Sequence, residues 1–469
     1  MVLKQAQQDL SSEPKKRRKV GFAAIDAGVE ANDCISIFLV RTAEEVGSES
    51  SFHVDPIDLN QFFGDIGRIY GYKDLKVNVW FSSISFRAYA DITYQSTSDG
   101  GKGVTELMPA LQKIFGESLL EKRDDFLQSF STDFHYIRNI ISNGEVLYPD
   151  ASKGSNGVSN HQMDGEVAPI EIVRMGLNSL PVGELYSRLV PLALLLVDGS
   201  SPIDVTDPKW EIYLEVEKKT TQQGDTNVRL LGFAVVYRFY RYPDNSRLRI
   251  SQILILPNCQ GNGHGWRLLK VINSVAISEN VYDLTVEEPS DYLQHVRTCI
   301  DIPRLLAFEP VKPAVSSVAS QLKERKLSKR TSGIQFDPPT AVVNAVRETL
   351  KITKKQFLQC WEVLIYLDID QNDRNCMENY RILVAERMKA DILGKDEGKS
   401  GKQVIEIPND YDHDMTFVMF SPSKSKDQVD ENENQMERNQ GNQEEQLSKL
   451  VDVRMEQIKQ IAEKVALHS

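Results

Sequence analysis

The chain has 469 residues, of which 41% are hydrophobic and 26% are charged, and its formal net charge is −12 at pH 7. This length predicts about three domains with enough apolar material for their cores, and no apolar run approaches the roughly 20 residues that span a bilayer. The negative charge disfavours direct binding of nucleic acid and suits a basic substrate, although it is equally typical of an ordinary soluble protein.

The amino-terminal tail, residues 1–30, carries one dense cluster of positive charge and lacks the apolar segment of a secretory signal. The cluster is similar to the single-cluster nuclear import signal of viral large T antigen, and it consists of Lys15, Lys16, Arg17, Arg18 and Lys19. Neighbouring like charges keep such a segment extended for a receptor groove, and the alternative is a solvated tail. We therefore expect the protein in the nucleus and in the cytoplasm.

Residues 31–165 are predicted to form an N-terminal α/β domain that is rich in strands. The evidence for strands is β-branched and aromatic runs or strict alternation, and the evidence for helices is apolar spacing of three and four. The predicted elements are strands over Ile35–Arg41, Leu75–Phe81 and Phe86–Tyr94 and helices over Val104–Phe115 and Ser118–Phe130. The last part of this region, residues 151–165, is rich in Ser, Gly and Asn and indicates a loop between domains.

Residues 166–310 are predicted to form a second domain in which several strands precede a Gly-rich turn. The elements are a helix over Val182–Leu189, an apolar run over Pro191–Val197, strands over Trp210–Glu217, Val228–Tyr237, Arg249–Leu256 and Tyr282–Val286, and a helix over Trp266–Ala276. Strands in hairpin-like succession argue against a Rossmann-type dinucleotide fold, which alternates strands with helices.

The rest of the chain divides into three parts. Residues 311–394 show helical spacing of apolar residues, and residues 395–446 are so polar that we expect a disordered acidic linker. The apolar stripe of residues 447–469 fits two readings equally, a helix that packs on its own domain and a helix that binds a partner. Five cysteines without CxxC pairs predict no disulfide framework and no metal site.

The stretch Gln252–Gly265, QILILPNCQGNGHG, contains the strongest functional signal. An apolar strand stops at Pro257, and three glycines on alternate positions then lead into a helix. A strand, a Gly-rich turn and a helix start together bind phosphate, because backbone N–H groups come close to an anion that the helix dipole also favours. Since a lone GxGxG also fits a flexible turn, the carboxylates downstream are needed to support this interpretation.

A pair of carboxylates, Glu287 and Glu288, follows the next predicted strand and precedes Pro289. Adjacent carboxylates in a partly desolvated site repel one another, which raises a pKa toward the range useful for a general base. Alternation directs the two side chains to opposite faces, so one of them is expected to act directly. The alternative is a pair of solvated loop residues.

Four motifs together resemble the type B histone acetyltransferase catalytic subunit, a member of the GNAT superfamily of N-acetyltransferases, in a plant-like form. They are YRFYRYPD from Tyr237, RISQILIL from Arg249, QGNGHG from Gln260 and LTVEEPS from Leu284. Further matches at Phe63–Asp65, Gly71–Lys76 and Ile203–Val205 extend the resemblance over roughly residues 30–390. It implies an α+β fold, with a mixed-sheet GNAT core between a strand-rich N-terminal domain and a helical C-terminal domain.

The resemblance also implies site residues. The catalytic carboxylates would be Glu287 as general base, Glu288 as its assistant and Asp198, where the family usually has Glu. The acetyl-coenzyme A contacts would be Ile253, Leu254, Ile255, Gln260, Gly261, Asn262, Gly263, His264, Gly265 and Trp266. The contacts to a histone tail would be Asp65, Trp210, Tyr237, Arg238 and Phe239. The family's acidic cluster is missing after Asp65, where Ile66 and Gly67 follow.

The reaction implied by the resemblance is direct attack by a lysine of the newly made histone-four tail on acetyl-coenzyme A, without a metal. The implied partner is a WD-repeat histone chaperone of the retinoblastoma-binding type, and neither nucleic acid nor a membrane is expected as a direct partner. The alternatives are acetylation of a non-histone amine and a catalytically silent nuclear scaffold that binds histones.

Overall fold

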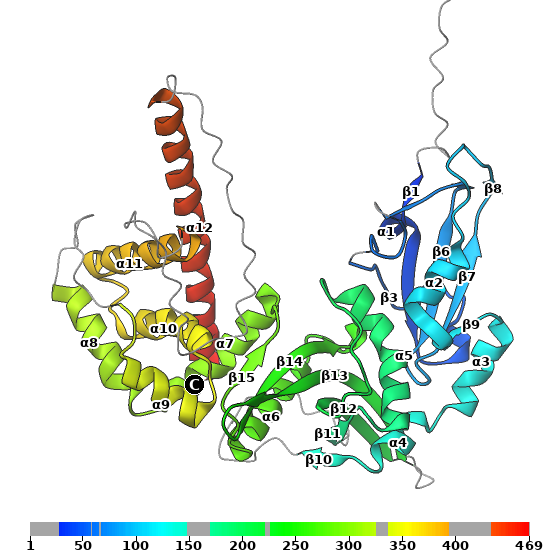
Figure 1. The fold of residues 1–469 in the computed structure, drawn as a ribbon, viewed down its shortest axis with the longest axis horizontal. Coiled ribbons are helices and arrows are strands. Elements are labelled where there is room, and N and C mark those ends of the chain that lie inside the picture. The colour runs from blue at the N-terminus through cyan, green and yellow to red at the C-terminus, as the bar shows by residue number, and fades with distance from the viewer. Residues whose placement is uncertain are drawn as a thin grey trace, which may run out of the picture. The chain divides into compact units, whose positions relative to one another are not determined.

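The computed structural model describes residues 28–57, 59–64, 67–147, 169–220, 226–324, 336–393 and 433–468, which form two compact units (Figure 1). The first unit contains the described residues up to 147, residues 169–238 and Ile250–Leu268. The second contains Phe239–Arg249 and the described residues from Leu269 onward. Both strands and helices build the chain, which confirms the α+β class.

The N-terminal part of the first unit is a five-stranded sheet with strand order β3-β2-β6-β7-β9. Its strands are β2 (Ile35–Val40), β3 (His53–Val54), β6 (Lys76–Ser82), β7 (Ala88–Thr93) and β9 (Leu119–Leu120). Because β2 runs parallel to β6 while β6 and β7 are antiparallel, the sheet is mixed. The three predicted strands of this region are confirmed, since each coincides with β2, β6 or β7 within two residues.

Shorter elements surround this sheet. Two small two-stranded ladders are formed by β1 (Val29–Glu30) with β4 (Arg68–Ile69) and by β5 (Tyr72–Lys73) with β8 (Ser96–Thr97). The helices are α1 (Ala31–Cys34), α2 (Leu107–Phe115), α3 (Arg123–Thr132) and α4 (Tyr136–Ile141). The second predicted helix differs from the structure, because β9 and a turn occupy its beginning and α3 starts only at Arg123.

The second sheet has the strand order β10-β11-β12-β13-β14-β15, and its first five strands lie wholly or partly in this unit. Its strands are β10 (Glu145–Leu147), β11 (Ile170–Gly176), β12 (Trp210–Thr220), β13 (Thr226–Arg241), β14 (Asn245–Ile255) and β15 (Leu284–Val286). The pairs β10–β11, β11–β12 and β12–β13 are antiparallel. A bulge interrupts the β12–β13 ladder, because Glu215 pairs with Gly232 while the next residue, Val216, pairs with Leu230.

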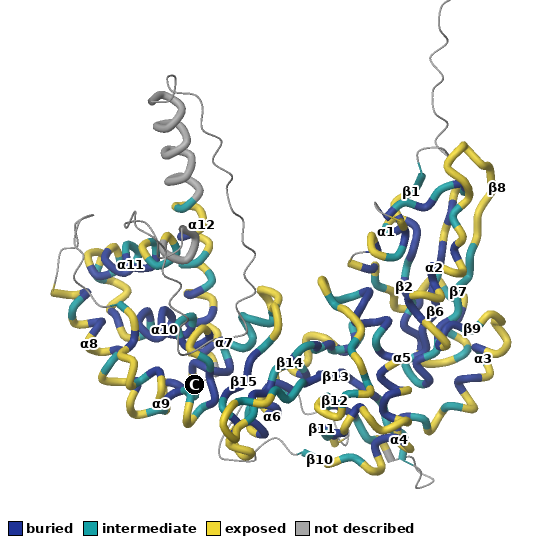
Figure 2. The backbone as a smooth tube through the Cα atoms, in the orientation of Figure 1, coloured by how far each residue is buried: buried dark blue, intermediate teal, exposed yellow. Residues whose placement is uncertain are grey.

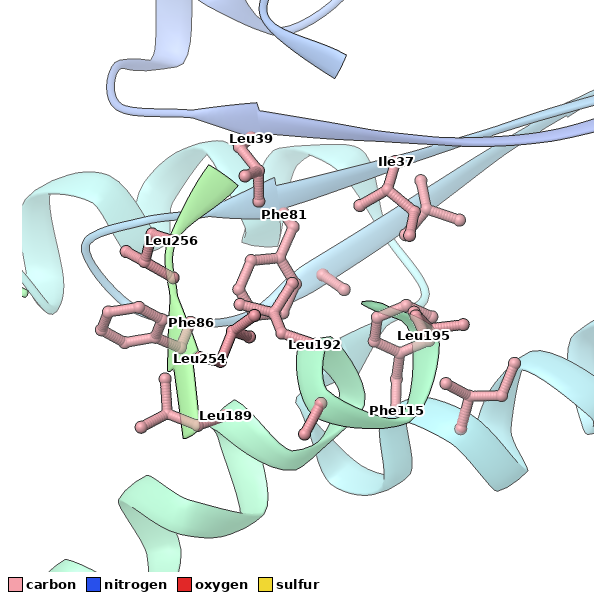
Figure 3. Packing of buried hydrophobic residues seen from close by; sticks show 14 of the residues in the cluster. Ile37, Leu39, Phe81, Phe86, Phe115, Leu189, Leu192, Leu195, Leu254 and Leu256 are labelled. Atoms are coloured by element: carbon pink, nitrogen blue, oxygen red, sulfur yellow. The ribbon is translucent and has the colours of Figure 1, made fainter. Parts of the chain in front are cut away.

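Helix α5 (Leu180–Leu196) packs between the two sheets of the first unit (Figure 3). Leu189, Leu192 and Leu195 contact the same apolar cluster as Phe81 of β6 and Leu254 of β14. The helix continues through Pro191, whereas the sequence predicted its end at Leu189. A proline inside a helix costs about 3 kcal/mol, and burial of each leucine contributes about 1.5–3 kcal/mol, so packing outweighs the lost hydrogen bond.

The second unit contains the end of β13, the beginning of β14, the strand β15 (Leu284–Val286) and a helical core. Its helices are the greater part of α6 (His264–Ser278), α7 (Asp291–Leu306), α8 (Val311–Glu324), α9 (Thr340–Leu350), α10 (Lys354–Asp368), α11 (Arg374–Leu393) and α12 (Glu433–His468). Trp361, one of the largest buried side chains among the described residues, lies in this core, and α7, α8 and α10 all contain buried residues (Figure 2).

Helix α12 packs on its own domain, which is one of the two readings that the sequence left open. Ile458, Ile461 and Val465 are buried in the same cluster as residues of α10 and α11, and Val451 is buried as well. The helix begins at Glu433, inside the stretch for which we expected disorder, because Glu, Gln, Met and Arg favour helix even where a segment is very polar. The part of that stretch before the helix lies within residues 394–432, which are outside the described residues.

Candidate functional site

At the end of β14, the backbone N–H and C=O groups of alternate residues point away from the neighbouring strand β13. The Leu256 N–H donates to the Leu231 carbonyl on β13 over 2.9 Å. Successive peptide groups of a strand alternate in direction, so the polar groups of Ile255 and Ile253 point the other way. In agreement, the Ile255 carbonyl accepts a hydrogen bond from Gln260 Nε2 at 3.0 Å. This edge has the geometry to pair with an extended ligand.

The Gly-rich turn leads from a short 3-10 helix (Pro257–Cys259) into α6. Gly261 and Gly263 have φ of 79° and 78°, and a Cβ at either would meet no atom within 4 Å, so both face open space in a backbone conformation that favours glycine. Asn262 Nδ2 holds the turn by donating to the Cys259 and Gln260 carbonyls, both at 3.2 Å.

Helix α6 begins at His264, directly after this turn. The first N–H groups of a helix have no acceptor within the helix, and the helix dipole places partial positive charge there. Two open glycines at a helix start fit an anionic group such as a pyrophosphate, because the backbone can approach it closely. The predicted elements around this turn, the strand before it and the helix after it, are confirmed.

A buried carboxylate, which was not predicted from the sequence, supports the start of α6. Glu215 on β12 is 0% exposed, and its Oε1 accepts from His264 Nδ1 at 2.8 Å and from Arg267 at 2.5 Å. Alternation along β12 placed Glu215 on the same face as two other glutamates, which is the pattern of a solvated strand face. Only the covering of that face by α6 makes Glu215 part of the site.

The loop that carries Asp198 is fixed to β14 by a buried glutamine. Gln252 donates through Nε2 to the Ser201 carbonyl at 2.7 Å and accepts from the Tyr186 hydroxyl at 3.1 Å. The same hydroxyl accepts from the N–H of Ile203 at 3.2 Å. Asp198 itself is exposed in this loop. The structure therefore brings the Asp198 loop to the strand that precedes the Gly-rich turn.

Three of the residues predicted to contact a histone tail lie together on β12 and β13. The rings of Trp210 and Tyr237 meet edge to face at 4.6 Å. The Tyr237 hydroxyl donates to Asp207 at 2.8 Å, and partial burial followed by this hydrogen bond raises the pKa of Tyr237. Arg238 bonds to Glu211 at 3.2 Å. Asp207 and Glu211 add carboxylates that the motif comparison did not indicate.

Three further predicted residues of the site, Glu287, Glu288 and Phe239, belong to the second unit. Glu287 follows β15, has a 48% exposed side chain and lies 3.9 Å from a guanidinium nitrogen of Arg249. The same guanidinium covers the ring of Phe239 at 4.5 Å. Glu288 has a φ of 34°, and Ser290 then caps α7 by accepting from the Leu293 N–H at 3.3 Å. The positive φ at Glu288 marks an abrupt turn between β15 and α7.

Cys259 beside the Gly-rich turn is a packing residue. Its side chain is buried in the apolar cluster of the first unit, and Arg229 donates to its sulfur at 2.9 Å. Burial raises the pKa of this thiol more than the neighbouring Arg229 lowers it. A thiol that stays protonated is a poor nucleophile, so the arrangement does not favour an acyl-cysteine intermediate.

Some predicted residues lie outside the described residues. They are Asp65 and the basic cluster Lys15–Lys19. Within the residues that are described, no group of three or more His, Cys, Asp or Glu side chains is arranged to hold a metal ion, and no helix is long and apolar enough to cross a membrane.

The chain is similar to known proteins over nearly its whole length. Residues 27–198 match the family described as the histone acetyl transferase HAT1 N-terminus. The type B histone acetyltransferase catalytic subunit of Arabidopsis thaliana is 51% identical over 99% of this chain and 98% of that protein. The same subunit of Zea mays is 46% identical over 99% of this chain and 97% of that protein, and that of Mus musculus is 25% identical over 83% and 87%. The crystal structure of an aminoglycoside acetyltransferase in complex with sisomicin matches 35% of this chain and 93% of its own at 13% identity, with a TM-score of 0.20.

Proposed function

As a member of the family of type B histone acetyltransferase catalytic subunits, the chain is a histone acetyltransferase, and we propose that it acetylates lysines in the N-terminal tail of newly made histone four with Glu287 as the general base. The observation that carries this proposal is the position of Glu287, which follows β15 directly, is accessible to solvent and faces the cation Arg249 at 3.9 Å. Acetyl-coenzyme A is the acetyl donor.

The donor is held by the turn and the strand edge of the first unit. The N–H groups at the start of α6 and the open backbone of Gly261 and Gly263 bind the pyrophosphate. The outward-facing peptide groups of Ile253 and Ile255 pair with the pantetheine arm, and an N–H there polarises the thioester carbonyl as it becomes an oxyanion. Gln260, Asn262 and Trp266 complete the donor site around this backbone.

The base is required because a lysine ammonium has a pKa of about 10.4 and cannot attack while it is protonated. Glu287 accepts that proton, and the free amine attacks the thioester carbon directly. Arg249 limits the directions that the Glu287 carboxylate can take. Glu288 and Asp198 add negative charge that attracts the lysine, and the exposed Asp198 carboxylate keeps its loop position through Gln252.

The histone tail contacts the aromatic and acidic residues of β12, β13 and the loop before them. Trp210 and Tyr237 offer ring surface to the aliphatic stems of tail residues, while Asp207 and Glu211 offer carboxylates to its basic groups. Phe239 and Arg238 continue the same strand, and Asp65 is proposed as a further contact. The net charge of −12 adds long-range attraction for a basic tail.

We further propose a partner and a location. A WD-repeat histone chaperone of the retinoblastoma-binding type presents the histone to the enzyme, and nucleic acid and membranes are not direct partners. Because α12 packs on its own domain, its exposed side chains rather than its buried stripe are available to the chaperone. The basic cluster Lys15–Lys19 gives access to the nucleus, and the protein also resides in the cytoplasm.

The test is radiolabelled acetyl transfer to a histone-four tail peptide by the full chain and by Glu287→Gln. Loss of a base that acts in the transition state lowers kcat by about 10²-fold or more. Asp291→Asn, four positions along the chain in the first turn of α7, is the matched control and should keep full activity. Wild-type activity in Glu287→Gln would refute the base assignment, and histone binding without any transfer by the wild type would favour the scaffold.

A further inference from the structure

We propose that Glu215 is a positioning residue that fixes the first turn of α6 and thereby sets the affinity of the enzyme for the pyrophosphate of acetyl-coenzyme A. This inference rests on the function proposed above for the Gly-rich turn. Glu215 does not itself touch the donor in this proposal, since like charges would repel. It acts through His264 and Arg267, which it holds in place.

One carboxylate oxygen of Glu215 makes both contacts, and both of its partners lie in the first turn of α6. Glu215 Oε1 accepts from His264 Nδ1 at 2.8 Å and from Arg267 at 2.5 Å, and His264 Nδ1 lies 3.3 Å from the same Arg267 nitrogen. Residues three apart in a helix share a face, so both donors approach Glu215 from the same side. A shift of the helix start relative to β12 would break both contacts together.

Burial makes these contacts energetically decisive. Glu215 is 0% exposed, and among the described residues no donor reaches its Oε2. A buried carboxylate costs several kcal/mol unless it is paired, and here the compensation comes through Oε1 alone. The position of lowest free energy for the start of α6 is therefore the one in which His264 and Arg267 both meet Glu215.

The bulge between β12 and β13 brings Glu215 to this level of the sheet. Glu215 pairs with Gly232, and the ladder shifts by one residue immediately after it. Gly232 in turn lies so close to β14 that a Cβ would stand 2.4 Å from Ile255 Cδ1 and 2.9 Å from the Leu254 carbonyl oxygen. The bulge, the glycine without a side chain (Gly232) and the buried Glu215 carboxylate therefore lie together at the end of β14, the strand that leads into the turn.

The turn is consequently fixed at both of its ends by different means. Gln260 and Asn262 hold its beginning through the backbone of residues 255–260. Glu215 holds the end of the turn through its contacts with the side chains of His264 and Arg267. Because Gly261 and Gly263 add backbone freedom, an anion site here requires such external support. The support concerns the pyrophosphate and leaves the pantetheine arm, which lies along β14, unaffected.

The experiment compares two acetyl donors with the full chain and its Glu215→Gln variant. Acetyl-coenzyme A carries the pyrophosphate, whereas acetyl-pantetheine lacks it. We expect the KM for acetyl-coenzyme A to rise about tenfold while kcat changes less than about threefold, which is the signature of lost ground-state binding. The KM for acetyl-pantetheine should stay within about twofold of the wild type, because that donor makes no contact with the turn.

Two controls separate this inference from the fold and from the proposed function. Glu171→Gln removes a carboxylate of β11 whose neighbour at 2.6 Å is Lys218 and should leave both KM values unchanged. Gly263→Asp places a charge and a Cβ in the turn itself and should abolish binding of coenzyme A in a calorimetric titration. If Gly263→Asp binds normally, the phosphate role of the turn is wrong; if only Glu215→Gln binds normally, the inference alone is wrong.

An equal loss with both donors would also overturn the inference, because it would indicate general destabilisation. Should Glu215→Gln fail to fold, the double variant Glu215→Met with Arg267→Met replaces the ion pair by apolar side chains of similar length. Such replacements are often neutral or stabilising. This variant should fold and show the same selective loss for acetyl-coenzyme A, and normal affinity for that donor would refute the role of Glu215.

Discussion

Tyr186 of α5 donates a hydrogen bond to Gln252 of β14 at 3.1 Å, in the buried region behind the Asp198 loop. The Gln252 amide then continues to the backbone of Ser201. This pair connects the helix between the two sheets, the strand that enters the Gly-rich turn and the loop of a proposed catalytic carboxylate. Its disruption should therefore affect stability and activity together.

The first prediction concerns Gln252→Leu. The substitution leaves the Ser201 carbonyl without its donor and Tyr186 without its acceptor, which costs about 1–3 kcal/mol for buried groups. Urea unfolding should show this loss, and kcat should fall because the Asp198 loop is released. Tyr186→Phe removes one of these bonds and also leaves the Ile203 N–H without its acceptor, so it should lose a similar amount of stability. Equal stability of the wild type and Gln252→Leu would contradict the prediction.

The second prediction concerns the close approach of β13 and β14 at Gly232. In Gly232→Ala the new methyl group meets the Leu254 carbonyl oxygen at 2.9 Å and Ile255 Cα at 3.0 Å, so backbone has to move. Overpacking of this kind destabilises by about 1–3 kcal/mol. Gly176→Ala on β11 is the control, since its methyl group meets only the Asn178 side chain at 3.0 Å. Thermal unfolding should separate the two variants clearly.

The third prediction concerns the acid sensitivity of the helical core. Burial, and then the charge of Lys464, lower the pKa of His295 below 6.5 in the folded state. The folded state thus binds a proton less readily than the unfolded state, so the contribution of His295 is complete above pH 6.5 and is lost as the pH falls through the folded pKa. The unfolding temperature should drop less between pH 7.5 and 5.5 in His295→Gln than in the wild type. Parallel pH profiles would show that His295 contributes nothing.

The fourth prediction concerns the attachment of α12. Glu362 of α10 is 3% exposed and pairs with Arg454 of α12 at 2.6 Å and with Arg387 of α11 at 3.0 Å. Arg454→Met leaves a buried charge partly uncompensated, which costs about 3–5 kcal/mol in comparable cases. We expect a value near the lower limit, because Arg387 remains, and guanidinium unfolding measures it.

The control for α12 is the exposed pair between Arg381 of α11 and Asp452 of α12, whose atoms approach to 2.5 Å. Solvent screens this pair, so Arg381→Met should cost less than about 1 kcal/mol. Each substitution removes an arginine from an ion pair between α12 and a neighbouring helix, α10 for Arg454 and α11 for Arg381. A similar cost for both would show that burial of Glu362 is not what secures α12.

Periodicity predicted most of the regular elements, because the spacing of apolar residues is set by the geometry of one strand or helix. The strands β2, β6, β12, β13 and β14 and the helix α6 agree with it within a few residues, and α9, α10 and α11 lie in residues 311–394, where it predicted helices. The prediction was wrong where packing overrules local preference. Helix α5 passes through Pro191 because both sheets cover it, and β9 replaces a helical start because β7 offers it a ladder.

For the functional site, the sequence by itself determined the Gly-rich turn and the carboxylates after β15, since a turn conformation and a strand end are encoded by neighbouring residues. Only the tertiary structure decided that Glu215 is buried, because its partners lie 49 and 52 positions away and belong to another element. The same holds for Gln252 with Tyr186 and for Arg249 with Glu287. A carboxylate on an alternating strand is solvated or buried according to what covers that face, and folding alone brings the cover into place.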